Sequence, residues 1–155
     1  RHRHLLPIAY SYSPLLLLTA RTCCGEFTSV HRAPVAESPA PMKLAVYGTL
    51  RNGSDRLGRI AETTLVYPGH RRFPAMIHDE GGEGTIVEIH EIDSETLAAY
   101  DRYEGVAAGI YQRDLMEVTM ANGTTLEASV YLAGEKLLAQ SASFVAVSGG
   151  DWLNR

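Results

Sequence analysis

The chain has 155 residues, 45% of them hydrophobic, which is enough for one ordinary soluble domain with a buried core. Residues 1–41 carry four arginines and two glutamates, a net charge of +2, whereas residues 42–155 carry ten basic and sixteen acidic side chains, a net charge of −6. The acidic balance argues against nucleic acid as a partner, because nucleic-acid binding needs a basic surface.

The first 41 residues differ from the rest in composition. Their basic start and apolar stretch resemble a secretory signal, but Pro7, Pro14 and a polar segment interrupt the stretch, so the signal peptide is the less favoured alternative. No apolar run there is long enough to span a bilayer, and we expect no membrane partner. Met42 directly precedes the first predicted strand. We therefore interpret residues 1–41 as a disordered N-terminal extension or translated upstream sequence, and residues 42–155 as the domain.

Cysteine usage separates the same two parts of the chain. Cys23 and Cys24 both lie in the N-terminal extension, so the domain itself holds no cysteine. A disulfide framework and a cysteine-based zinc site are therefore excluded from the domain. A cytoplasmic location is only the default expectation.

The domain is predicted to begin with a buried strand at residues 43–46, followed by the sequence VYGTLRNG at residues 46–53. Gly48 permits backbone angles that other residues avoid, and Asn52 with Gly53 is a turn signal. The pattern allows two interpretations: a plain turn after a strand, or a loop whose free backbone N–H groups hold an anionic ligand.

Residues 51–59 are predicted to form a polar loop, and the β-branched and aromatic residues at 61–73 favour a strand. A glycine-rich turn is expected within residues 74–84. Gly82 and Gly84 superficially match part of a dinucleotide fingerprint, but they precede a strand and open no helix, so we reject that interpretation. Residues 85–92 alternate apolar and polar side chains and are predicted to form a strand.

Residues 93–105 give the clearest helix signal in the chain. Asp93 or Ser94 can cap the N-terminus, and Gly105 provides a typical C-terminal stop. One face of the helix should carry two carboxyl groups beside an apolar residue; its members are Leu97, Tyr100, Asp101 and Glu104. Because that face should be buried, the two carboxyl groups require an explanation.

Two strands are predicted at residues 111–120 and 125–134, joined by Asn122 and Gly123, the strongest short hairpin signal in the chain. Residues 135–147 are mixed in pattern, and residues 148–155 form a tail. Strands dominate and their connections are short, so we expect an α+β fold with a mostly antiparallel sheet or small barrel.

The domain lacks the usual signatures of an enzymatic nucleophile or a phosphate-binding loop. His70, His78 and His90 lie in strand-like segments without metal-ligand spacing. Chemistry would therefore depend on carboxylates and backbone donors. Glu104, at the end of the helix beside Tyr103, is the best candidate, because partial burial would raise the pKa of its carboxyl group. The alternative is a solvated glutamate at a helix end.

Several short segments together resemble the gamma-glutamylcyclotransferase-like family, which includes gamma-glutamylamine cyclotransferases. They are VYGTLRNG, FPAM, GTIVEIHEI, LAAYDRYEG, YQR, ASVY and GGDW, in the family's order and spacing from Met42 to about the C-terminus. The resemblance implies a small, mostly antiparallel β-barrel flanked by helices.

The resemblance also implies a substrate-binding loop and a catalytic glutamate. Carried over to this sequence, the loop is Tyr47, Gly48, Thr49 and Leu50, the acid/base is Glu104, and Tyr131 lies near the substrate. The sequence departs from the family at two positions: Tyr100 replaces a leucine and Thr85 a common glutamate. Neither residue takes part in the expected chemistry, although Tyr100 is placed to reshape the pocket wall.

The implied activity is the cyclisation of a γ-glutamyl amine or amino acid to 5-oxoproline with release of the free amine. The substrate's own α-amino group is the nucleophile, so no enzyme nucleophile, metal or cofactor is needed. We expect a small-molecule γ-glutamyl substrate and a monomer or weak homodimer. The alternatives are a non-catalytic small-molecule-binding or interaction domain on the same fold, and a barrel scaffold without a ligand.

Overall fold

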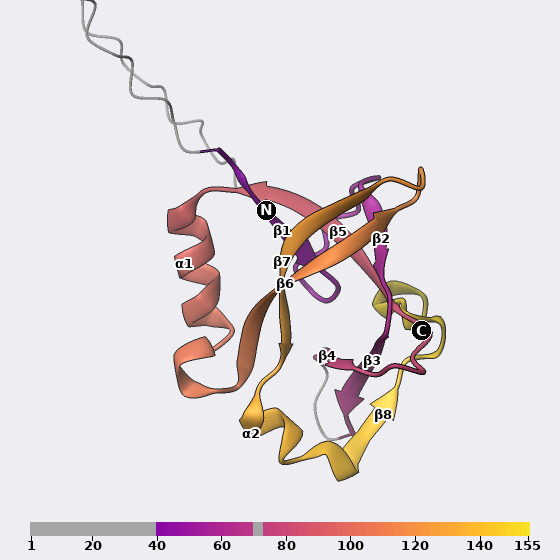
Figure 1. Ribbon diagram of the computed structural model, residues 1–155. Coiled ribbons are helices and arrows are strands. Elements are labelled where there is room, and N and C mark those ends of the chain that lie inside the picture. The colour runs from indigo at the N-terminus through magenta and orange to yellow at the C-terminus, as the bar shows by residue number, and fades with distance from the viewer. Residues whose placement is uncertain (1–39, 70–72) are drawn as a thin grey trace, which may run out of the picture. The chain divides into compact units, whose positions relative to one another are not determined.

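The computed structural model describes residues 40–69 and 73–155, so the expectations for residues 1–39 and for His70 lie outside the described part of the chain. Five strands form a closed barrel in the order β1-β5-β2-β6-β7 (Figure 1). They are β1 (Met42–Val46), β2 (Leu57–Ile60), β5 (Thr85–Ile92), β6 (Tyr111–Met120) and β7 (Thr125–Ala133). All neighbouring pairs are antiparallel except β1 with β7, which is parallel. The predicted α+β fold with a mostly antiparallel barrel is confirmed.

A three-stranded sheet and several short helices accompany the barrel. The sheet has the order β4-β3-β8, with bounds β3 (Thr63–Pro68), β4 (Ala75–His78) and β8 (Phe144–Ala146). The helical elements are α1 (Ser94–Tyr103), η1 (Val106–Ala108), α2 (Glu135–Leu138), η2 (Ser141–Ser143), η3 (Ser148–Gly150) and η4 (Trp152–Asn154). Figure 1 shows α1 at the left of the barrel, with β3 and β8 at the lower right. Among the described residues, no helix is both long and apolar enough to cross a membrane.

Strand β2 corrects the sequence analysis, which predicted a loop at residues 51–59. Leu57–Ile60 pair with β5 on one side and with β6 on the other. A Cβ atom on Gly58 would lie only 2.5 Å from Val118 Cγ1, so the glycine leaves space for the neighbouring strand. The strand is therefore specified by its two partners, because four residues containing a glycine have little strand preference of their own.

The C-terminal parts of β1 and β7, residues 44–46 and 130–133, are buried on both faces, which explains their continuous apolar sequence. Successive side chains of a strand point to opposite faces. On β1, Ala45 packs in one core with Trp152, whereas Leu44 and Val46 pack in a second core with Leu97 of α1. A hydrophobic core therefore lies on each face of β1. Together the two cores fix the end of β1 at which the following loop begins.

The hairpin predicted at residues 111–134 is confirmed. β6 and β7 pair antiparallel from Tyr111 with Ala133 to Thr119 with Thr125. Gly123 has φ +83°, a conformation in which glycine is favoured, and Asn122 Oδ1 accepts hydrogen bonds from the N–H and hydroxyl of Thr124. This local turn chemistry sets the register of the two longest strands.

Removing residues 1–41 should leave the fold intact, because the first barrel strand begins at Met42. A chain that starts at Met42 is expected to unfold within about 2 °C of the parental melting temperature, well under 1 kcal/mol for a domain of this size. Differential scanning calorimetry measures the shift. As a contrast, removing residues 1–46 deletes β1 and should abolish cooperative unfolding. A large fall in melting temperature for the chain that starts at Met42 would show that residues 1–41 belong to the fold.

Candidate functional site

One cavity gathers every site residue that the sequence analysis proposed. It has a volume of about 390 Å³ and lies where the loop after β1 meets the end of α1 and strand β7. The proposed residues that line it are Tyr47, Gly48, Thr49, Leu50, Glu104 and Tyr131. Its other lining residues are Ala45, Val46, Phe73, Pro74, Tyr103, Ile110 and Tyr111. The cavity therefore combines a largely apolar and aromatic wall with one carboxyl group and a stretch of loop backbone.

The loop offers unpaired backbone donors to this cavity. Arg51 N–H donates to the Gly48 carbonyl at 3.2 Å, which closes a tight turn. Within residues 40–69 and 73–155, the backbone N–H groups of Gly48, Thr49 and Leu50 donate to no protein acceptor. Consecutive free N–H groups in a turn are typical of an anion-binding nest.

Gly48 is required for a different reason from the one that the sequence suggested. It does not adopt a positive φ, so the loop does not use the conformational freedom of glycine at this position. A Cβ atom there would lie 2.7 Å from Cγ of Pro74, which also lines the cavity. The absence of a side chain lets the loop pack directly against the proline ring.

The side chain of Tyr47 fixes the start of the loop. It is 7% exposed, and its hydroxyl donates to the Tyr131 carbonyl at 2.6 Å and accepts from Met76 N–H at 3.3 Å. Burial, followed by the nearby Tyr111 hydroxyl, raises the pKa of the Tyr47 hydroxyl well above its usual value. Tyr47 therefore remains a neutral link between β1, β4 and β7.

Helix α1 places Glu104 at the edge of the cavity. The Asp93 carboxylate accepts from Thr96 N–H at 2.7 Å and caps the N-terminus, and Gly105 ends the helix at φ +68°, as predicted. Glu104 is the C-cap residue and is half-buried. Burial raises the pKa of its carboxyl group. No donor among the described residues bonds this carboxyl group, so it is available to a ligand.

The second carboxyl group on the same helix face, Asp101, has protein partners. Its Oδ1 accepts from the Tyr131 hydroxyl at 2.8 Å and lies 3.3 Å from Arg113 Nε. Burial and the hydrogen bond to Asp101 both raise the pKa of the Tyr131 hydroxyl. Asp101 thus holds Tyr131 in the cavity wall. The two carboxyl groups on this helix face therefore differ: Asp101 has partners, and Glu104 has none among the described residues.

Two residues that depart from the family pattern lie away from the cavity. Tyr100 packs against the core that contains Leu97 and does not line the cavity, contrary to the expectation that it reshapes the wall. Its place on the buried face of α1 directs it to that core. Thr85 is fully buried and its hydroxyl bonds that of Thr63 at 3.0 Å. Tyr103 lines the cavity but is 73% exposed, so it contributes little to the burial of Glu104.

Four further residues of the wall were not predicted as site residues from the sequence: Phe73, Pro74, Ile110 and Tyr111. The Tyr111 hydroxyl donates to the Pro74 carbonyl at 2.7 Å and so joins β6 to the segment that precedes β4. Phe73, Pro74 and Tyr111 belong to short segments that resemble the family, FPAM and YQR. That resemblance was the only sequence signal that these residues line the cavity, because neither segment has a motif typical of a binding or catalytic site.

The described histidines lie in strands, as expected. His78 ends β4 and is exposed, and His90 lies in β5 with Nε2 2.7 Å from the Glu88 carboxylate. Neither lines the cavity. Over residues 40–69 and 73–155, no three His, Cys, Asp or Glu side chains are grouped so that they could hold a metal ion.

Comparison with known proteins gives one family. The family described as "Gamma-glutamyl cyclotransferase, AIG2-like" matches residues 44–154, which includes all six proposed site residues. No curated protein sequence matches the chain.

Solved structures share the fold at low sequence identity. A structure named gamma-glutamyl cyclotransferase is 16% identical, with a TM-score of 0.52, over 68% of this chain and 69% of its own. An AIG2-like protein from Mus musculus is 22% identical, with a TM-score of 0.53, over 61% of this chain and 78% of its own. A uropathogenic E. coli-specific protein is 24% identical, with a TM-score of 0.53, over 74% and 94% respectively. At these identities the likeness shows the fold alone.

Replacing Glu104 with glutamine should not destabilise the protein at neutral pH and is expected to raise its melting temperature. The pKa of Glu104 is raised in the folded protein, so ionisation costs the fold free energy. That cost is absent below the unfolded pKa of about 4.3 and complete above the raised folded pKa. Glutamine stays neutral, so the advantage of Glu104→Gln should grow as the pH rises.

Thermal unfolding between about pH 4 and pH 8 measures this trend. Glu95→Gln, at an exposed position of the same helix, is the matched control and should show no such gain. A melting temperature of Glu104→Gln that falls below the parental value as the pH rises would mean that the folded protein favours the charged form.

Proposed function

This chain belongs to the family of AIG2-like gamma-glutamyl cyclotransferases, and from that premise we propose that it is an enzyme that converts a γ-glutamyl amine or amino acid to 5-oxoproline and the free amine. The proposal rests on two features of one cavity: a carboxyl group with a raised pKa, and a loop with three N–H groups. Neither has a hydrogen-bond partner in the part of the chain that the structure describes. Membership of the family alone leaves the substrate and the activity open, because fold does not fix function.

The reaction needs no nucleophile from the protein. The α-amino nitrogen of the substrate attacks its own γ-carbonyl carbon and closes a five-membered ring. Well-oriented intramolecular reactions reach effective molarities of roughly 10⁵–10⁸ M, whereas general acid/base help adds only about 10²–10⁴-fold. Proximity therefore supplies the larger share of the acceleration, and the cavity has to hold the substrate in a folded conformation.

Glu104 would move the proton. Its carboxylate accepts a proton from the attacking α-amino group as the new C–N bond forms and the carbonyl oxygen becomes an oxyanion. The same carboxyl group returns the proton to the leaving nitrogen as the old C–N bond breaks. A pKa raised by burial brings Glu104 closer to the working pH, where one group can both accept and donate.

The loop backbone would supply the electrostatic stabilisation. The N–H groups of Gly48, Thr49 and Leu50 are suited to an anion, either the α-carboxylate of the substrate or the developing oxyanion. Tyr131 of β7 lines the same cavity and donates to Asp101, and Gly48 of the loop packs against Pro74. The cycle as written uses no cofactor.

Glu104→Gln should abolish turnover while the fold and most of the ligand affinity persist. Glutamine has nearly the same size and still forms hydrogen bonds, but it cannot exchange a proton at neutral pH. The loss of general acid/base help predicts a fall of about 10²–10⁴-fold in kcat. The measurement is 5-oxoproline release at saturating substrate, across a panel of γ-glutamyl amino acids and γ-glutamyl amines.

Two variants calibrate that result. Glu95→Gln removes an exposed carboxylate from the same helix and should retain the parental rate. Asp101→Asn weakens the support of Tyr131 without touching the proton transfer, so it should lose less than Glu104→Gln. Parental turnover in Glu104→Gln would remove Glu104 from the mechanism. A parental protein inert toward the whole panel would favour the non-catalytic binding domain.

Gly48→Ala should weaken substrate binding and leave the barrel folded. The added methyl group would lie 2.7 Å from Pro74 Cγ, so either the loop or the rigid proline ring must move. If the overpacking cost of about 1–3 kcal/mol is borne by displacement of the loop, affinity should fall roughly 5- to 150-fold. Calorimetric titration with a substrate, beside circular dichroism, measures the effect. Gly81→Ala is the control, because its Cβ would meet only Asp79 Oδ1 at 3.8 Å. Unchanged affinity in a folded Gly48→Ala would mean that this loop is a plain turn and does not bind the substrate.

A further inference from the structure

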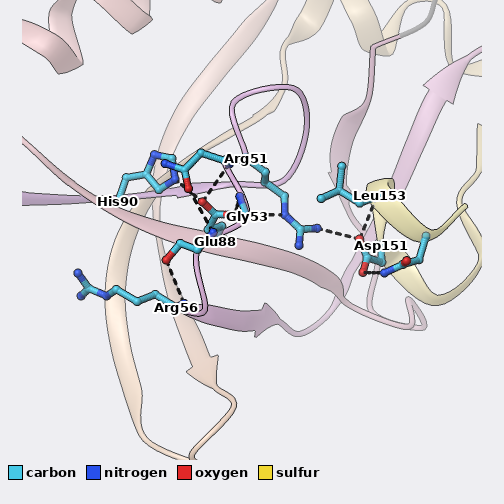
Figure 2. A network of polar contacts seen from close by, with 10 residues as sticks. Arg51, Gly53, Arg56, Glu88, His90, Asp151 and Leu153 are labelled. Carbon is cyan, nitrogen blue, oxygen red and sulfur yellow. Dashed lines mark hydrogen bonds and ion pairs between the residues drawn. The ribbon is translucent and has the colours of Figure 1, made fainter.

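The loop after β1 has two halves with different surroundings. Gly48, Thr49 and Leu50 line the cavity, whereas the next three residues, 51–53, contact a network of buried charges (Figure 2). Two carboxylates of this network contact residues 51–53: Glu88 of β5 and Asp151 near the C-terminus. Arg51 lies between them and connects the loop to a segment 100 residues away.

Glu88 holds the far end of the loop. Its side chain is fully buried, and its carboxylate accepts from Asn52 N–H and Gly53 N–H, each at 3.1 Å, and contacts His90 Nε2 at 2.7 Å. Burial raises the pKa of Glu88, but the hydrogen bonds from His90 and from the loop backbone outweigh it, and the pKa lies below its usual value. A charged Glu88 therefore anchors two backbone groups of the loop.

Arg51 is bonded more closely to Asp151 than to Glu88. Its side chain is 5% exposed, and one terminal nitrogen donates to Asp151 Oδ1 at 2.7 Å. Its Nε lies 3.7 Å from Glu88 Oε2, which is too long for a hydrogen bond, and this buried Nε has no acceptor among the described residues. The position of the Arg51 guanidinium thus depends on Asp151.

The C-terminal segment is built to hold Asp151 in place. The Asp151 carboxylate also accepts from Leu153 N–H at 3.0 Å and from Asn154 Nδ2 at 2.7 Å. On one side of it, Gly150 has φ +66°, and a Cβ there would overlap the Gly84 carbonyl. On the other side, Trp152 is 5% exposed in the barrel core, with its ring centroid 6.1 Å from that of Tyr67.

We propose that Asp151 is a positioning residue for the loop at residues 48–53, acting through Arg51, so that the C-terminal GGDW segment sets the geometry of the cavity wall. The proposal concerns the shape of the loop, and its consequence for catalysis rests on the proposed function. Gly150 fits the segment against β5, Trp152 fixes it in the core, and Asp151 transmits that position to the loop. Within the cavity, Gly48 packs against Pro74, but the N–H groups of residues 48–50 have no acceptors among the described residues, so no hydrogen bond from these groups holds this half of the loop.

The same contacts could simply stabilise the whole fold. A stabilising role and a positioning role differ in which amides exchange faster when the contact is removed. A stabilising contact changes the melting temperature and the exchange of all amides together. A positioning contact changes the amides of Asn52 and Gly53, which depend on the loop's anchorage, before the rest of the barrel opens. Residue-resolved hydrogen–deuterium exchange distinguishes these outcomes without any substrate.

The experiment compares Asp151→Asn, Arg51→Gln and the double variant with the parental protein. Asp151→Asn removes a charge-assisted hydrogen bond, and the amides of Asn52 and Gly53 should exchange about 10- to 100-fold faster while the amides of β6 and β7 stay protected. Because Asp151 acts through Arg51, Asp151→Asn should add little in the Arg51→Gln background. Additive effects, or parental exchange at both loop amides, would overturn the proposal.

A matched control comes from the same strand as Glu88. Glu91→Gln also removes one carboxylate that faces an arginine, Arg56 at 3.0 Å, but both side chains are nearly half exposed. Such a pair contributes little, so loop exchange should remain parental. If Asp151→Asn does not fold, Asp151→Glu keeps the charge and displaces the carboxylate by one methylene group. Its loop amides should also exchange faster, and parental exchange in that variant would overturn the proposal.

Steady-state kinetics then connect the loop to catalysis. In Asp151→Asn, KM should rise if the loop N–H groups hold the substrate carboxylate, and kcat should fall if they hold the oxyanion. Faster loop exchange with both constants unchanged would overturn the claim that the segment sets the cavity wall. If the parental protein turns over none of the γ-glutamyl compounds, the proposed function fails, while the exchange experiment still decides whether Asp151 positions the loop.

Discussion

The parallel pairing of β1 with β7 is the constraint on which the site depends. It spans only two residue pairs, Leu44 with Ser129 and Ala45 with Val130, and it closes the barrel between segments that lie more than 80 residues apart. The Tyr47 hydroxyl extends the contact by donating to the Tyr131 carbonyl at 2.6 Å. Closure thereby places the loop after β1 against the strand that carries Tyr131, and the bond from Tyr131 to Asp101 attaches α1 and Glu104 to the same place. The cavity therefore forms because the pairing of β1 with β7 closes the barrel.

The parts of the fold that the sequence predicts are those whose signal is local. Helix α1 has its capping aspartate and terminal Gly105, and the β6–β7 hairpin has Asn122 and Gly123 at its turn. Strand β2 and the packing of Trp152 were not predicted, because neither is specified by its neighbours in the chain. Gly58 allows β2 to lie beside β6, and Trp152 enters the core because Gly150 lets the backbone approach β5. Such contacts depend on residues far away in the sequence.

The residues of the candidate site also divide into those that the sequence predicts and those that only the structure shows. Glu104 was found because helix periodicity puts it on the buried face of α1, and the resemblance to a family drew attention to the loop at residues 47–50. The reason given for Gly48 was wrong, since its backbone is ordinary and the close approach of Pro74 explains the glycine. The link from Arg51 to Asp151 had no sequence signal, because an arginine beside a turn and an aspartate in a tail are individually common on surfaces.

Two carboxyl groups, Glu88 of β5 and Glu104 at the end of α1, differ in the partners that the fold gives them. Glu88 is the more deeply buried, yet its pKa is lowered, because His90 and two backbone N–H groups satisfy the charged form. Glu104 is only half-buried, yet its pKa is raised, because no donor among the described residues compensates for the water that it loses. In Glu88 the hydrogen bonds to the charged form outweigh the cost of burial, and in Glu104 the cost of burial is not offset. The loop at residues 48–53 donates to Glu88 from its far end. Its N–H groups at residues 48–50, which line the same cavity as Glu104, have no acceptor among the described residues. The carboxylate of Glu88 thus holds the loop through its hydrogen bonds, whereas the carboxyl group of Glu104 accepts none from the described residues.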